Sequence, residues 1–167
     1  MRRLWFLVPI VFGMWFVGCG EEKLTVQDNL KGTWKLTART LPDGTTLKPP
    51  DVGGLMEWFA INDRRGHVTV AITGQGDGQR TYDFENNACT VSASAFSMER
   101  SLLMGRSYLH GDGPVETDTA PRSLEGRLTV DGKKTTLTYG NGVAQTFEEA
   151  SLTVTVPNRY TDTWKKE

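Results

Sequence analysis

Apolar and polar side chains alternate in short runs along most of the chain beyond residue 30. In LKGTWKLTART, Trp34, Leu36 and Ala38 fall on one side of an extended segment, and polar residues fall on the other. The segments HVTVAIT and SLTVTV repeat this alternation. A period of two residues is typical of a half-buried β-strand, and no long segment after residue 24 shows a helical period. We therefore predict an all-β fold.

Turn residues separate these runs and indicate how the strands are connected. Asp131-Gly132 and Asn141-Gly142 each lie between two alternating segments, which is a strong signal for a tight hairpin. Asn86-Asn87 also suits a tight turn, between RTYDFE and ACTVSASA. These connections predict about eight strands in an antiparallel up-and-down meander. Closing the meander into a barrel would remove its exposed edges, and a two-sheet sandwich is the alternative.

Two segments do not follow the alternating pattern. Residues 96–109 include SMERSLLM, which is compatible with a short helix or with the start of a strand. Residues 110–122 are polar and rich in glycine and proline, so we expect a long loop there.

The first residues of the chain have the composition of an export signal. Arg2 and Arg3 precede an uncharged apolar run from Leu4 to Val17. A helix of that length rises roughly 21 Å, short of the ~30 Å hydrocarbon core of a bilayer, and Pro9 weakens it further. A basic start, an apolar centre and small residues before a cleavage site are typical of a secretory signal peptide.

The end of this segment, Phe16-Val17-Gly18-Cys19, resembles the lipobox of bacterial lipoproteins, with Phe16 in place of the usual leucine. The resemblance implies that the signal peptide is removed and that Cys19 becomes a lipidated N-terminus. It would carry a diacylglyceryl thioether and usually an N-acyl chain such as palmitate. Two or more chains give stable membrane anchoring. An ordinary signal peptide cut nearby and an uncleaved anchor are the alternatives.

This interpretation divides the chain into four parts and locates the protein. The parts are a signal peptide (1–18), the lipidated cysteine with a short tether (19–29), a lipocalin-like barrel domain (30–160) and a C-terminal tail (161–167). Ten extended tether residues reach about 35 Å at most, so the barrel would lie close to the bilayer. Gly20 stands where an aspartate favours inner-membrane retention in enterobacterial lipoproteins. We expect a lipid-anchored protein of the cell envelope, on the outer membrane facing the periplasm if the source is diderm.

Cys89 would be the odd cysteine of an exported protein, because a lipidated Cys19 has no thiol left to pair with it. We interpret Cys89 as a small buried apolar residue on a strand, with a reactive thiol as the alternative.

The motif Gly32-Thr33-Trp34 opens the first predicted strand and resembles the lipocalin signature. Together with the later PDG and EGRLTVDGKKTTLTYGNG, it is similar to the lipocalin-like domains of small bacterial lipoproteins. The resemblance implies an eight-stranded antiparallel barrel in which Gly32 and Trp34 are structural. Trp34 would pack across the closed end with a late arginine stacked on it. Arg159 lies late enough, although PNRY differs from the family pattern; otherwise Trp34 is an ordinary core residue.

Five aromatic residues on alternating strands are candidates for a ligand-binding lumen. They are Trp58, Tyr82, Phe84, Tyr139 and Phe147. Lining a cavity, they would bind a small hydrophobic or amphipathic molecule. Filling the lumen instead, they would leave a structural barrel whose loops contact an envelope protein partner.

Composition and motifs argue against other classes of function. The 19 basic and 20 acidic residues form no long like-charge block, so we expect no nucleic-acid partner. GQGDG precedes a strand-like segment rather than the helix that a phosphate site needs. His67 and His110 have no metal-ligand spacing, and no serine lies in Gly-x-Ser-x-Gly. We predict a non-enzymatic protein with no cofactor, no metal site and no catalytic residues.

Overall fold

The structure of the protein, a computed structural model, describes most of the chain from residue 26 onward. The described ranges are 26–62, 64–76, 79–108, 116–118 and 122–167. The predicted signal peptide and Cys19 lie outside these ranges, as does His110.

Strands dominate the described residues, which contain one short helix, α1 (Val26–Leu30), and twelve strands. The first six strands are β1 (Gly32–Thr40), β2 (Thr46–Leu47), β3 (Val52–Ala60), β4 (Arg65–Gly76), β5 (Gln79–Val91) and β6 (Ala95–Tyr108). The remaining strands are β7 (Glu116–Asp118), β8 (Arg122–Asp131), β9 (Lys134–Tyr139), β10 (Ala144–Glu148), β11 (Ser151–Val156) and β12 (Tyr160–Lys166).

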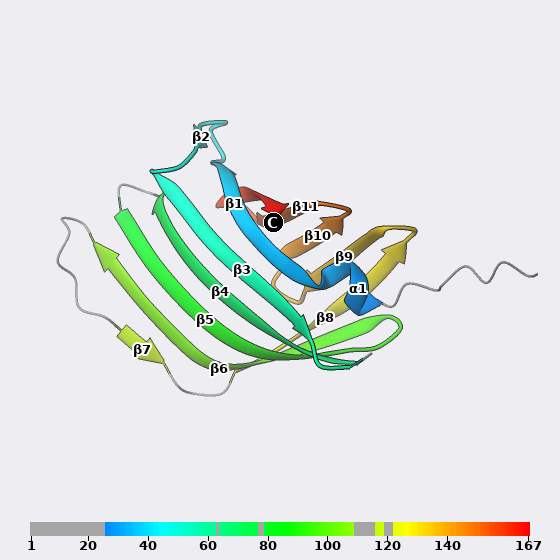
Figure 1. The fold of residues 1–167 in the computed structure, drawn as a ribbon. Helices are drawn as coiled ribbons and strands as arrows, with labels where there is room; N and C mark the ends of the chain where they lie inside the picture. Colours follow the sequence, from blue (N-terminus) through cyan, green and yellow to red (C-terminus); the bar gives the residue numbers. More distant parts are fainter. Residues whose placement is uncertain (1–25, 63, 77–78, 109–115, 119–121) are drawn as a thin grey trace, which may run out of the picture.

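The strands form a closed antiparallel barrel (Figure 1). Among the described residues, ten strands follow one another around the ring as β1, β3, β4, β5, β6, β8, β9, β10, β11 and β12. The ring closes where β12 pairs with β1, while β2 pairs with β1 and β7 pairs with β6 outside it. The predicted all-β up-and-down barrel is confirmed, with ten strands in place of about eight.

The two predicted glycine hairpins are present. Asp131-Gly132 connects β8 to β9, and Asn141-Gly142 connects β9 to β10. Both glycines have a positive φ, 57° at Gly132 and 84° at Gly142. Glycine adopts this conformation without the steric cost that a Cβ brings, so turn chemistry determines these connections.

The turn predicted at Asn86-Asn87 is wrong. β5 continues through both residues, and its pairing with β6 shifts register there, with Asn86 opposite Leu102 and Asn87 opposite Arg100. This leaves Ser101 as the extra residue of a β-bulge, which bends a strand without ending it. The reversal comes instead at Ser92, whose hydroxyl accepts a hydrogen bond from the backbone N–H of Ala95 at 3.2 Å.

Residues 96–108 lie in β6. The segment for which the sequence allowed either a short helix or a strand is therefore a strand. The C-terminal tail predicted from residue 161 is also wrong, because 160–166 form β12. Trp164 on this strand is fully buried, and Asp162, two residues earlier, faces the same way and is 1% exposed. The carboxylate of Asp162 at an inward position interrupts the apolar alternation. The sequence pattern therefore does not predict the last strand.

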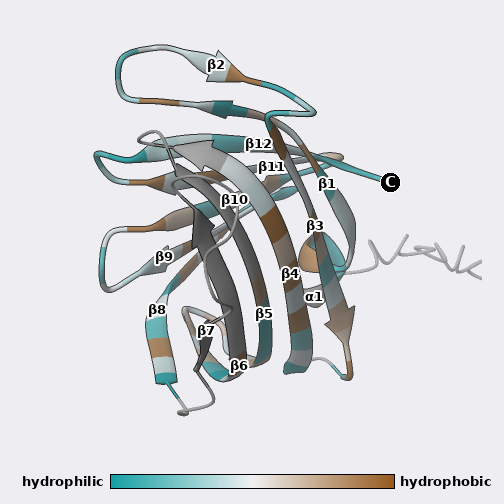
Figure 2. Cartoon of the chain, turned by 90° about the vertical axis from the view of Figure 1, so that its left-hand side faces the viewer, coloured by the Kyte–Doolittle hydropathy of each residue, from teal (hydrophilic) through white to brown (hydrophobic). Residues whose placement is uncertain are grey.

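Aromatic residues and α1 fill one end of the barrel. Trp34, Trp58 and Phe147 are buried there, and the Phe147 ring lies 5.4 Å from Trp34 and 5.5 Å from Trp58, edge-on to both. The helix α1 contacts β3 on one side of the ring and β9 and β10 on the other, so it lies across the opening. Its Leu30 is fully buried. Figure 2 shows apolar and polar positions interspersed along the strands of the barrel.

Candidate functional site

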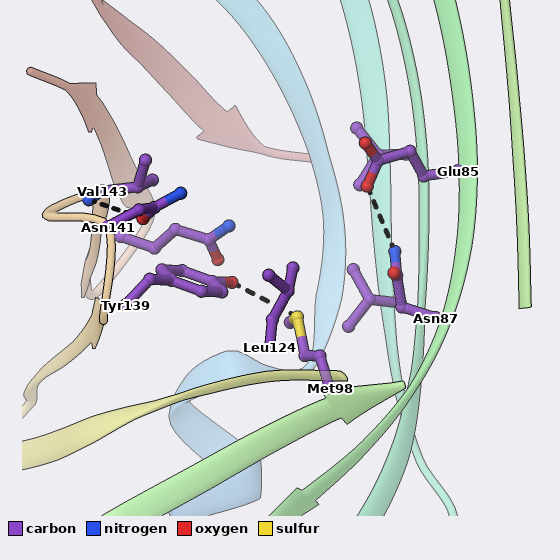
Figure 3. A pocket seen from close by; sticks show the side chains of 10 residues that line it. Glu85, Asn87, Met98, Leu124, Tyr139, Asn141 and Val143 are labelled. Carbon is purple, nitrogen blue, oxygen red and sulfur yellow. Dashed lines mark hydrogen bonds between the residues drawn. The ribbon is translucent and has the colours of Figure 1, made fainter. Parts of the chain in front are cut away.

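A pocket of about 180 Å³ lies between the wall formed by β4 and β5 and the hairpin formed by β9 and β10 (Figure 3). Of the ten described residues that line it, half are apolar and half are polar. The apolar residues are Val68, Val70, Met98, Leu124 and Val143. The polar residues are Glu85, Asn87, Tyr139, Asn141 and Gln145.

Strand pairing positions one wall of this pocket. Val70 lies opposite Glu85, and Val68 lies opposite Asn87, in the antiparallel register of β4 and β5. Directly paired residues point to the same face of a sheet, so these four side chains form one patch on the inner face. Two apolar and two polar groups therefore meet in the same wall.

Tyr139 forms much of the opposite wall. Its ring packs edge-on against Phe96, with the centroids 4.8 Å apart, and its hydroxyl donates to Met98 Sδ at 3.3 Å. Burial raises the pKa of the Tyr139 phenol well above its usual value, and the charge of Glu85 and, at alkaline pH, that of the Cys89 thiolate add to the rise. The phenol is therefore neutral near pH 7.

Hydrogen bonding within the pocket is incomplete. Asn87 is 2% exposed, and its Nδ2 donates to Glu85 Oε2 at 3.5 Å, the upper limit for such a bond. Within the described part of the chain, its buried Oδ1 has no hydrogen-bond partner, and neither has Oε1 of Gln145. Buried polar atoms in folded proteins nearly always have a partner. The polar part of the pocket lining is therefore incompletely hydrogen-bonded among the described residues.

The five aromatic residues predicted to line the lumen do not come together. Tyr139 lines the pocket, whereas Trp58 and Phe147 are buried in the aromatic cluster at the α1 end. Phe84 lies opposite Ala71, which is exposed and itself lies opposite Leu55, 41% exposed, so Phe84 is on the outer face of the barrel. The side chain of Tyr82 lies outside the described part of the chain.

The polar lining residues Glu85, Asn87 and Gln145 were not among the predicted ligand contacts, and Asn87 was predicted to lie in a turn. Counting back by twos from the inward-facing Val91 and Cys89 reaches Asn87 and Glu85. The predicted turn at Asn86-Asn87 broke that count, and this is why the signal was lost.

Cys89 is a buried free thiol, 3% exposed. Burial raises its pKa from 9.0 to about 11, although a hydrogen bond from the Gly66 backbone acts in the opposite direction. A thiol reacts as its thiolate, so these surroundings make Cys89 unreactive near pH 7. This favours the buried apolar role over the reactive one.

A second polar cluster joins the neighbouring strands β1 and β12 away from the pocket. Arg39 Nε and Nη2 each donate to a carboxylate oxygen of Asp162 at 2.7 Å, and the guanidinium carbon lies 3.8 Å from the centroid of Tyr160. A Cβ on Gly74 would come within 2.8 Å of Arg39 Nη1, so glycine at this position of β4 leaves room for the guanidinium. The pair is internally satisfied, and we assign it a structural role.

Among the described residues, no three histidine, cysteine or acidic side chains lie close enough together to hold a metal ion. No helix in the same part of the chain has the length and hydropathy to cross a bilayer.

The fold and pocket define an antiparallel β-barrel with an amphipathic lumenal site. Comparison with known proteins adds no family: no family model matches the chain, and no curated protein matches it.

Proposed function

We propose that the protein is a lipid-anchored protein of the cell envelope whose lipocalin-like barrel binds a small amphipathic molecule. The observation that carries the binding proposal is the pocket beside Tyr139, where apolar walls meet polar groups with unsatisfied hydrogen bonds. Small-molecule sites have this composition.

The volume of the pocket limits what it can hold. A cavity of about 150 Å³ accepts benzene, and drug-sized ligands occupy roughly 300–1,000 Å³. At about 180 Å³, this pocket suits a compact molecule and not a long acyl chain. The proposed ligand therefore carries a short apolar body with one polar group.

The pocket favours binding over catalysis. Its ten described lining residues include one carboxylate, Glu85, and no histidine, serine or cysteine. A nucleophile with an adjacent base, the usual arrangement for covalent catalysis, is absent from this set.

Membrane anchoring rests on the lipobox-like Phe16-Val17-Gly18-Cys19. Val26, where α1 begins, lies seven positions after Cys19, so an extended connection reaches about 25 Å at most. Two apolar side chains are exposed at the α1 end of the barrel: Phe59 (52%), near the end of β3, and Ile61 (60%), in the β3–β4 connection. A lipid on Cys19 would hold these apolar side chains near the bilayer.

Native mass spectrometry of the full lipidated chain tests the binding proposal. We expect a retained small molecule in the wild type and its loss in Val70→Phe, whose ring would occupy the pocket. Ala71→Phe is the matched control, because Ala71 is the next residue on β4 and faces outward. Repeatedly ligand-free wild-type spectra, or equal retention in both variants, would count against binding in this pocket.

A separate experiment tests the anchor. Cys19→Ser should abolish acylation and release the barrel from membranes, with a mass lower by the lipid. If the variant fractionated with membranes and its mass changed only by the substituted atom, the lipoprotein proposal would be wrong.

A structural or interaction lipoprotein is the second candidate. It is favoured by the dense filling of the α1 end, where Trp34, Trp58 and Phe147 leave the pocket only part of the lumen. An empty pocket in the mass spectra would support this candidate.

A further inference from the structure

Glu85 provides a negative charge on the inner wall of the barrel. Its carboxylate accepts one long hydrogen bond, from Asn87 Nδ2 at 3.5 Å, and within the described residues no lysine, arginine or histidine forms an ion pair with it. Glu85 is half-buried, and a partly desolvated carboxylate is stabilised by a positive or hydrogen-bonding partner.

Two neutral side chains near Glu85 hold acceptor oxygens that receive no hydrogen bond from the described residues. Asn87 Oδ1 and Gln145 Oε1 are buried acceptors without a partner. The Tyr139 hydroxyl donates its proton to Met98, which leaves the phenolic oxygen as a further acceptor. The half-buried Glu85 carboxylate is therefore the acceptor that a bound molecule would use, and a donor that also carries positive charge suits it best.

The remaining walls suit an apolar body beside that charge. Val68 and Val70 lie next to Asn87 and Glu85 in the strand register. Met98, Leu124 and Val143 complete the apolar lining. Charge and apolar surface therefore lie within one site of about 180 Å³, which limits the body to about the size of a benzene ring.

We propose that this pocket recognises a small protonated amine, which rests on the proposed small-molecule function and names its ligand class. The ammonium group lies at Glu85 and donates hydrogen bonds to its carboxylate. The short hydrocarbon part lies against Val68 and Val70. A carboxylate ligand would face the like charge of Glu85, and a neutral alcohol would offer a hydrogen bond to this carboxylate without the opposite charge.

Three probes that share one ring and differ in the polar group test this proposal. Benzylamine, benzyl alcohol and benzoate are titrated at pH 7 into the full lipidated chain in phosphatidylcholine nanodiscs, with empty nanodiscs as the blank. Isothermal titration calorimetry should show saturable binding of benzylamine and at least tenfold weaker binding of the other two probes.

Two matched substitutions locate the binding. Glu85→Gln keeps the shape of the side chain and removes its charge, so it should weaken benzylamine at least tenfold and leave benzyl alcohol unchanged. Glu99→Gln makes the same change on the outer face of the barrel, opposite the exposed Ala88, and should alter neither affinity. The three-probe comparison on the wild type decides the question even where a variant fails to fold.

The possible outcomes separate a failure of the amine assignment from a failure of small-molecule binding. Equal or tighter binding of benzyl alcohol or benzoate would overturn the amine assignment and leave small-molecule binding intact. Saturable benzylamine binding that Glu99→Gln weakens as much as Glu85→Gln would place the amine outside the pocket and overturn the proposal. No binding of any probe would also overturn the amine assignment, and the retained-ligand spectra of the wild type would then decide separately whether the barrel binds another small molecule.

Discussion

Lys166 Nζ lies 5.2 Å from the centroid of the Trp34 ring, on the strand that closes the barrel against β1. The family resemblance implied a late arginine in this position, with Arg159 as the candidate. Arg159 is instead exposed in the turn between β11 and β12. The cation over Trp34 is a lysine because Lys166 pairs directly with Trp34 in the β1–β12 register.

Gly32 should be required for this arrangement. Its φ is +145°, and a Cβ added there would collide with the Lys166 side chain. Gly32→Ala should lower the free energy of unfolding by about 1–3 kcal/mol, because alanine is strained at this φ. Guanidinium titration measures the loss. Removing the collision with Lys166→Ala in the same chain should restore only part of it, and full recovery would contradict a backbone cause.

Trp34 should be among the most costly residues to truncate. It is fully buried, it packs edge-on against Phe147, and its Nε1 donates to the Leu30 carbonyl at 3.2 Å. Trp34→Ala should cost about 3–5 kcal/mol of unfolding free energy, since it leaves a large cavity and frees the Leu30 oxygen. Trp34→Phe should cost less, because it keeps most of the packing. Chemical denaturation that found almost no loss in Trp34→Ala would contradict this role.

The local sequence pattern predicted the barrel architecture, but it did not predict where the structure departs from local turn preference. The alternation around Trp34 and the Asp131-Gly132 and Asn141-Gly142 turns predicted an antiparallel barrel, because each depends on residues adjacent in sequence. Asn86-Asn87 has turn chemistry, yet neighbouring strands hold both residues in β5. Tertiary pairing therefore outweighed local preference at this point.

The residues of the site were harder to predict from the sequence than the fold was. Aromatic residues attract attention as ligand contacts, but Trp58 and Phe147 pack against each other, and this depends on strands about ninety positions apart in the chain. The polar lining comes from β5 and β10, whose facing across the lumen follows from barrel closure. Only Tyr139 is both one of the five predicted aromatic residues and a residue that lines the pocket.

The buried Arg39–Asp162 pair should be costly to break and tolerant of joint replacement. Asp162→Asn removes the charge that compensates Arg39, so it should lower the unfolding free energy by about 3–5 kcal/mol. Arg39→Met combined with Asp162→Leu removes both charges and should lie within about 1–2 kcal/mol of the wild type. Denaturant titration of the singles and the double gives the coupling. A double variant as unstable as the sum of its singles would show that the pair is not acting as a unit.

Stability should decline in alkali through Cys89. The folded thiol has its pKa raised from 9.0 to about 11 by burial, so between these values the unfolded chain loses this proton first. Fewer protons on the unfolded state mean that unfolding free energy falls as pH rises, by about 2–3 kcal/mol across the window. Tyr139, whose pKa burial also raises, adds a loss of the same sign above pH 10. Urea titrations from pH 8 to 11 should therefore show a steeper decline in the wild type than in Cys89→Ala, and parallel curves would contradict the raised thiol pKa.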